Sequence, residues 1–82
     1  MEIEKYGDYW IEDGIVYFVY AKGTALDFEL ARRIVSDLIK FLDGKIYPSL
    51  IDINGIVSSN KSARDYIAEE SKVLFSKVAF LS

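Results

Sequence analysis

The chain has 82 residues, a net charge of −3, and 51% hydrophobic against 28% charged residues, which predicts one small globular domain and not a disordered segment. It contains no histidine and no cysteine, which excludes disulfides and catalysis by Ser-His-Asp or Cys-His side chains. We therefore expect no enzyme, no metal site and no cofactor. Scattered Lys and Arg residues argue against nucleic-acid binding, and no apolar run is long enough to span a membrane.

The first residues form a polar lead-in, residues 1–7. Residues 1–5 are acidic and lack an apolar core, so they do not resemble a signal peptide. We therefore expect a cytoplasmic protein.

An antiparallel hairpin follows. Residues 9–12 alternate in the period of a strand, and Asp13-Gly14 is a two-residue hairpin signal, which predicts strands over 9–13 and 15–21. The second strand has no polar alternation, so we expect it to be central in its sheet and covered on both faces.

The first helix is predicted over 25–42. Thr24, with Asp27 three residues on, is typical of a capping box, and Gly44 is a natural helix stop. Five apolar residues recur at helical spacing and form the predicted buried stripe: Ala31, Ile34, Val35, Leu38 and Leu42.

A third strand is predicted over 46–53, with Pro48 near its start or at an irregularity because proline lacks a backbone donor. A helix between two strands implies a right-handed crossover, so this strand should pair in parallel with 15–21. We expect the loop 55–60 to follow.

The last two elements are a second helix over 61–71 and a fourth strand over 77–81. Ser59 or Asn60 should cap the helix. Arg64 and Asp65 fit a solvated face of this helix.

Six segments appear in an order and spacing that resemble a small bacterial family of unknown function, which is classed as STAS-like after sulfate transporters and anti-sigma-factor antagonists. They are Tyr9–Ile15, Ala31–Val35, Gly44-Lys45 with Pro48, Asp52–Gly55, Ser62–Tyr66 and Val78–Leu81. The resemblance implies an α/β fold, a STAS-like βα superhelix. Its N-terminal β-hairpin is followed by β-α-β-α-β with a mixed, largely parallel sheet.

The resemblance carries two further implications. Members of the family continue past the fourth strand, so the single domain over 1–82 is expected to lack its C-terminal part. In the antagonists a serine of the corresponding turn is phosphorylated, but Lys61 stands at that position here. We therefore expect no phosphorylation switch at this turn.

The turn after the third strand is the candidate ligand or partner loop. Its residues are Asp52, Asn54, Ser58, Ser59, Asn60, Lys61 and Ser62. The loop amides and the following helix start could bind a small anion, although an ordinary polar loop with a capped helix explains the same residues better. Asp52 could be a functional acid, but a carboxylate that holds the turn is the favoured interpretation.

Aromatic residues are abundant. Six of them could line an apolar pocket for a lipid-like ligand, or belong to the core or to an association surface, the core being favoured: Tyr17, Phe18, Tyr20, Phe28, Phe41 and Tyr47. The strand ending at Leu81 has no charge after Lys77, so its edge is unprotected. We expect a homo-oligomer, a two-fold dimer, with Val78 and Phe80 in the association surface.

Together these patterns predict a non-enzymatic, STAS-like regulatory or protein-interaction module. The alternative is a small-ligand or lipid-binding domain with an apolar, aromatic-lined pocket. A protein partner or a small ligand is compatible with the sequence.

Overall fold

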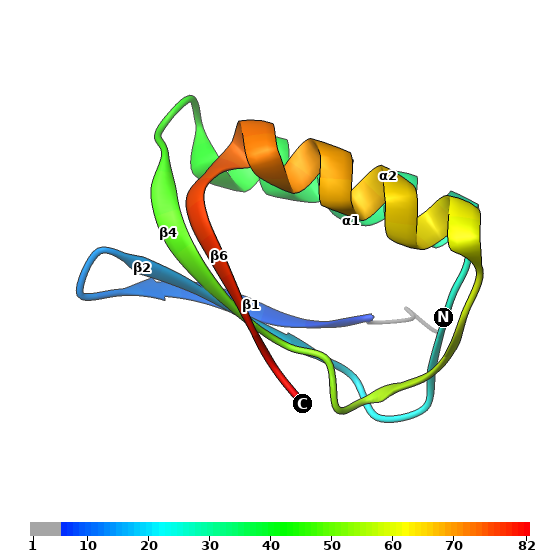
Figure 1. The fold of residues 1–82 in the computed structure, drawn as a ribbon. Coiled ribbons are helices and arrows are strands. Elements are labelled where there is room, and N and C mark those ends of the chain that lie inside the picture. Colours follow the sequence, from blue (N-terminus) through cyan, green and yellow to red (C-terminus); the bar gives the residue numbers. More distant parts are fainter. Residues whose placement is uncertain (1–5) are drawn as a thin grey trace, which may run out of the picture.

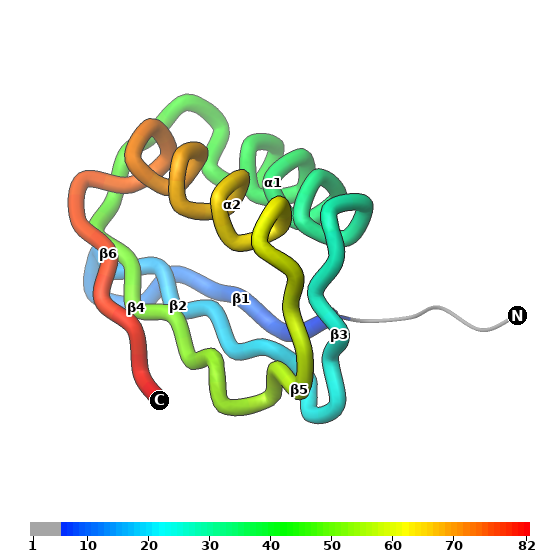
Figure 2. Tube along the Cα trace, turned by 45° about the vertical axis from the view of Figure 1, so that its right-hand side comes forward, coloured from blue at the N-terminus to red at the C-terminus, as the bar shows by residue number. Residues whose placement is uncertain are grey.

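The computed structural model describes residues 6–82 and shows two helices on one face of a four-stranded sheet (Figure 1). The elements in chain order are β1 (Gly7–Glu12), β2 (Ile15–Tyr20), β3 (Thr24–Leu26), α1 (Phe28–Leu42), β4 (Tyr47–Asp52), β5 (Ile56–Ser59), α2 (Lys61–Leu74) and β6 (Phe75–Leu81). The main sheet has the order β1-β2-β4-β6, while β3 and β5 form a separate two-stranded sheet beside it (Figure 2). The predicted α/β fold with a mixed, largely parallel sheet is confirmed.

The N-terminal hairpin forms as predicted. Asp13 and Gly14 have φ angles of 53° and 75°, the left-handed pair that a tight hairpin turn requires, and β1 pairs antiparallel with β2. The polar lead-in is shorter than expected because Gly7 already belongs to β1, and residues 1–5 lie outside the described part of the chain.

The strand β2 is central, between β1 and β4, but only one of its faces is fully covered. Val16, Phe18 and Tyr20 are buried under the helices, whereas the alternate side chains that begin with Ile15 are half-buried. The prediction that both faces are covered was therefore wrong. An uninterrupted apolar run does not distinguish a strand covered twice from one whose second face is partly open.

The helix α1 begins later than predicted. The Oδ1 atom of Asp27 accepts a hydrogen bond from the backbone amide of Leu30 at 2.8 Å, so Asp27 is the N-cap. The Thr24 hydroxyl instead donates to the carbonyl oxygen of Ala21 at 2.6 Å, and Thr24 starts β3. The predicted capping box was wrong because the Thr24 hydroxyl bonds to the backbone before β3 and not to an amide of α1.

The second half of the chain follows the predicted crossover. The strand β4 pairs in parallel with β2, and the register shifts between Tyr47 and Pro48, so proline lies at an irregularity as expected. Of the two residues predicted to cap α2, Ser59 and Asn60, it is Asn60 that does so. The expected loop over 55–60 is largely the strand β5, which was missed because its partner β3 was taken as the start of a helix.

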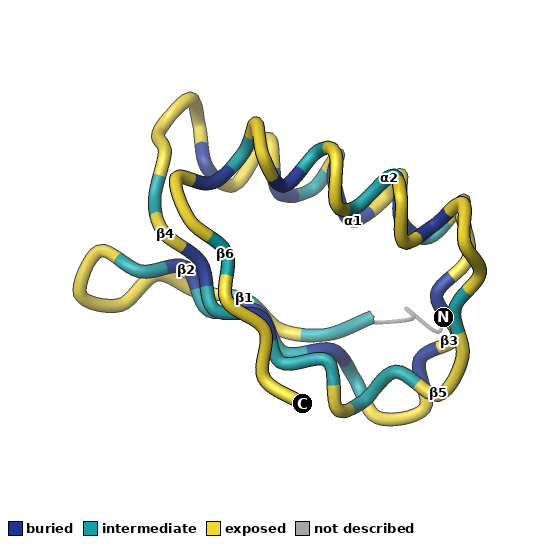
Figure 3. The backbone as a smooth tube through the Cα atoms, viewed as in Figure 1, coloured by how far each residue is buried: buried dark blue, intermediate teal, exposed yellow. Residues whose placement is uncertain are grey.

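The core lies between the sheet and the helices. The stripe predicted for α1 is buried in full, and all of it but Val35 belongs to one hydrophobic cluster with the buried side chains of β2, Ile51 of β4 and Phe75 of β6. Figure 3 shows where the buried residues lie along the helices and strands. Phe75 caps the C-terminal end of α2 and starts β6, so helix and strand join without a loop, and the strand begins earlier than predicted. None of the helices within 6–82 is long and apolar enough to cross a membrane.

Candidate functional site: a cavity at the carboxyl ends of the parallel strands

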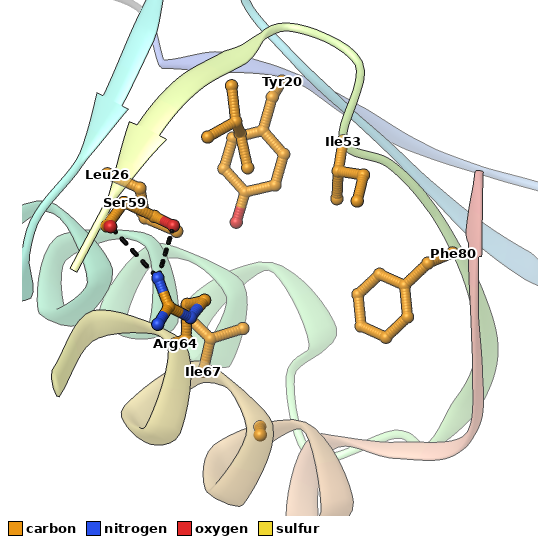
Figure 4. A pocket seen from close by; sticks show the side chains of 9 residues that line it. Tyr20, Leu26, Ile53, Ser59, Arg64, Ile67 and Phe80 are labelled. Carbon is orange, nitrogen blue, oxygen red and sulfur yellow. Dashed lines mark hydrogen bonds between the residues drawn. The ribbon is translucent and has the colours of Figure 1, made fainter. Parts of the chain in front are cut away.

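A cavity of about 390 Å³ lies between α2, the turn leading into β5, and the carboxyl ends of β2, β4 and β6. We call it the Tyr20 cavity. Its lining residues are Tyr20, Leu26, Ile53, Ile56, Ser59, Arg64, Ile67, Ala68 and Phe80 (Figure 4). The carboxyl ends of parallel strands are where α/β sheets usually place their ligand sites, and the volume falls in the usual range of such pockets, ~300–1,000 Å³.

A tight backbone contact holds β5 beside this cavity. A side chain at Gly55 would collide with the carbonyl oxygens of Tyr20 and Ala21, so only glycine permits the approach. The Gly55 carbonyl then accepts hydrogen bonds from the amides of Gly23 at 2.9 Å and Thr24 at 3.0 Å. The residues on either side of this turn therefore become walls of the cavity.

One polar group of the cavity is the hydroxyl of Tyr20 (Figure 4). The side chain is only 6% exposed, its ring packs against Phe18 with centroids 4.7 Å apart, and its hydroxyl points into the cavity (Figure 4). No residue within 6–82 forms a hydrogen bond with this hydroxyl. Burial raises the pKa of Tyr20 to about 12, so the group is a neutral donor and acceptor at physiological pH.

The guanidinium of Arg64 lies at the rim. Its Nη1 atom donates to the carbonyl oxygen and to the Oγ atom of Ser59, both at 3.0 Å. No carboxylate of the described chain lies within ion-pair distance of it, and the cavity has no acidic lining residue. Arg64 therefore contributes an uncompensated positive charge and further N–H donors to an otherwise apolar space.

The candidate loop divides into separate local contacts. The Oδ1 atom of Asp52 accepts from the amide and the side-chain nitrogen of Asn54, at 2.9 and 2.8 Å, so Asp52 holds the turn as favoured above. The Oδ1 atom of Asn60 accepts from the amide of Ala63 at 2.9 Å and from the Ser62 hydroxyl at 3.1 Å. These polar atoms satisfy one another.

The rest of the loop is similarly dispersed. Lys61 forms an exposed ion pair of 2.7 Å with Asp65, and Ser58 is exposed on β5. Only Ser59 of the candidate loop lines the Tyr20 cavity. Whether the loop as a whole contacts a partner stays a prediction.

Arg64 is exposed, as predicted for a solvated helix face, but nothing in the sequence indicated that it also lines a cavity. Sequence reasoning also did not identify Ile53 and Ile56, the apolar pair on both sides of Asn54-Gly55, as the wall of a site. The spacing of Ile53 and Ile56 indicates a cavity wall only when β5 is known to be a strand that pairs with β3.

The remaining chemical features of the described residues are their possible metal ligands and their shifted pKa values. The described residues contain no group of three or more carboxylate, imidazole or thiolate side chains that could hold a metal ion. Two tyrosines have shifted pKa values: burial raises both, and for Tyr6 a hydrogen bond of 2.7 Å to Asp37 adds to the effect. Both shifts move the groups further from neutrality, where acid–base catalysts operate.

Comparison with known proteins shows one family and one fold. The chain is similar to a solved structure titled "Crystal Structure Analysis of Mglu", with a TM-score of 0.74 and 15% sequence identity over 100% of this chain. This chain spans 22% of the length of that one, and a likeness at this identity shows the fold alone. A search of the curated proteins found no match. The sequence profile of DUF7793, a domain of unknown function, matches residues 9–82, so the chain belongs to this family.

Proposed function

We propose that this domain is a non-enzymatic, STAS-like protein-interaction module that docks a second copy of itself along β6. The observation that carries the proposal is the contrast between the two edges of the main sheet. The β6 edge exposes Phe80 by 57% and Leu81 by 47%, whereas the β1 edge carries Asp8 and Glu12. Charged residues protect natural edge strands from pairing, and β6 lacks them beyond Lys77.

The sequence of β6 suits two-fold pairing with itself. In an antiparallel pair centred on Val78, Lys77 of one copy lies opposite Ala79 of the other, and no like charges face each other. The two sheets would become continuous, and main-chain hydrogen bonds would give most of the affinity.

Composition supports a non-enzymatic role. The chain has no His or Cys. The carboxylate of Asp52 accepts a hydrogen bond from Asn54, and the carboxylate of Asp65 forms an ion pair with Lys61. The STAS-like resemblance agrees with an interaction module, since the antagonists act through protein contacts.

Sedimentation velocity over a range of micromolar concentrations tests the proposal. We expect a dimer for the unmodified chain and a monomer for Ala79→Lys, which places a second ammonium opposite Lys77 of the other copy. Ala79 is exposed and alternates with Phe80, so the Tyr20 cavity is not altered. Val73→Lys, on the 71% exposed outer side of α2, is the matched control and should remain dimeric. A monomer at all concentrations, or equal effects of the two variants, would contradict the proposal.

Small-ligand binding is the second candidate function. The observation that favours it is the apolar Tyr20 cavity with the unpaired hydroxyl of Tyr20 inside it. Ligand binding in this cavity does not require that β6 pairs with a second copy.

A further inference from the structure

We infer that the Tyr20 cavity binds a small organic anion whose apolar body fills the space between α2 and the strand ends and whose anionic group bonds to Arg64. The inference rests on the second candidate function, small-ligand binding, and names the class of ligand; it does not depend on edge pairing. Three observations carry it: a tyrosine hydroxyl that points into the cavity without a partner within 6–82, an uncompensated cation and apolar walls.

The hydroxyl of Tyr20 shows that the cavity is suited to a polar atom. This side chain is 6% exposed, and its hydroxyl points into the cavity without a hydrogen bond to any residue within 6–82 (Figure 4). The hydroxyl itself is open to the cavity and is not one of the fully enclosed polar atoms of the described chain, so water can reach it there. A ligand oxygen that hydrogen-bonds to Tyr20 would replace that water.

Arg64 determines the charge of the ligand. Its guanidinium is fixed at the rim by two hydrogen bonds to Ser59, both 3.0 Å long, and its other N–H groups have no partner within the described chain. No acidic side chain lines the cavity, so an anion meets attraction without repulsion there. Guanidinium binds carboxylates and other oxyanions through charge-assisted hydrogen bonds.

The walls determine the rest of the ligand. Six of the lining side chains are purely hydrocarbon: Leu26, Ile53, Ile56, Ile67, Ala68 and Phe80. At ~30 Å³ for the volume of a water-sized group, the cavity has room for about a dozen non-hydrogen atoms. A medium-chain or aromatic carboxylate has this size and this division into an apolar body and one anionic end. A nucleotide does not, since its body is polar and its several phosphate charges would meet a single arginine.

Octanoate is the probe for the first experiment. It is titrated into the ¹⁵N-labelled chain, and amide shifts are followed in parallel titrations with octanol and octylammonium. We expect octanoate to shift amides of residues that line the cavity, above all Ile53, Ile56 and Ile67. Octanol should bind about tenfold more weakly or worse, because it lacks the charge. Equal binding of all three probes, or shifts confined to the other face of the sheet, would overturn the inference.

Four variants then locate the contacts. Arg64→Gln should weaken octanoate binding about tenfold or more, and Tyr20→Phe, which keeps the ring, about three- to tenfold. Ala68→Phe fills the cavity from an exposed helix position and should abolish binding while the melting temperature is kept. Arg32→Gln, on the exposed side of α1, is the matched control and should bind as the unmodified chain does.

Separate results distinguish this inference from the pairing of β6. Ala79→Lys should retain full octanoate affinity even when it abolishes the dimer. If Ala68→Phe dissociates a dimer and octanoate binding is absent, the second copy occupies the cavity and the inference fails. Unchanged affinity in Arg64→Gln would also refute it.

Discussion

Truncation of Leu38 to alanine tests whether α1 packs on the sheet as described. Leu38 is 5% exposed, lies in the centre of the buried stripe and borders an internal void of about 20 Å³ next to Phe18 and Ile51. The lost carbon atoms are worth about 2.4 kcal/mol at ~0.8 kcal/mol per buried CH₂ group. The void left behind adds to this cost, so we expect a loss of about 3–5 kcal/mol in the free energy of unfolding.

This loss is large for an 82-residue chain, whose total stability should be about 4–12 kcal/mol. Urea unfolding measures it through a lower midpoint with an unchanged slope. The matched control is Ile39→Ala, one residue further along the helix and 53% exposed, which should change stability by less than about 1 kcal/mol. If Leu38→Ala costs less than about 0.5 kcal/mol, or no more than the control, the assigned packing of α1 is wrong.

Three further predictions concern single side chains. Asp27→Ala should lower the free energy of unfolding by about 0.5–2 kcal/mol through loss of the α1 N-cap, whereas Thr24→Ala should not shorten the helix measured by NMR secondary shifts. Ser49→Ala should leave the urea midpoint unchanged or raise it, because the buried Ser49 hydroxyl has no partner within the described chain. The pKa of Tyr20 is about 12 in the folded chain against 10.0 for a free tyrosine, so its stabilising contribution is complete below pH 10 and is lost as the pH rises toward 12. Tyr20→Phe should reduce this alkaline loss of unfolding free energy by about 2–3 kcal/mol, measured by urea unfolding at a series of pH values.

The main elements could be predicted from the sequence because their signals are local. The Asp13-Gly14 turn, the spacing of the α1 stripe and the crossover between β2 and β4 each follow from the chain's own pattern or from general topology. Asp52 also took the structural role that its position at a strand end favoured. These features need no knowledge of distant contacts.

The small sheet of β3 and β5 could not be predicted in this way. Thr24 and Asp27 fit a capping box equally well by type, and only the backbone bonds from Gly23 and Thr24 to Gly55 show that Thr24 belongs to a strand. The Tyr20 cavity depends on that pairing, because Leu26 of β3 and Ile56 of β5 are two of its walls. Long-range pairing therefore creates the site, and local propensity does not reveal it.

Backbone amide hydrogen exchange of β6 at two protein concentrations directly tests whether a second copy pairs with this strand. If β6 pairs with a second copy, the amides of Val78–Leu81 that point away from β4 become protected as the concentration rises, and Ala79→Lys removes this protection. Amides of β4, which is paired on both sides within one chain, should be protected at every concentration. Rapid exchange of the outward amides of β6 at all concentrations, beside a protected β4, would contradict the pairing of β6 with a second copy.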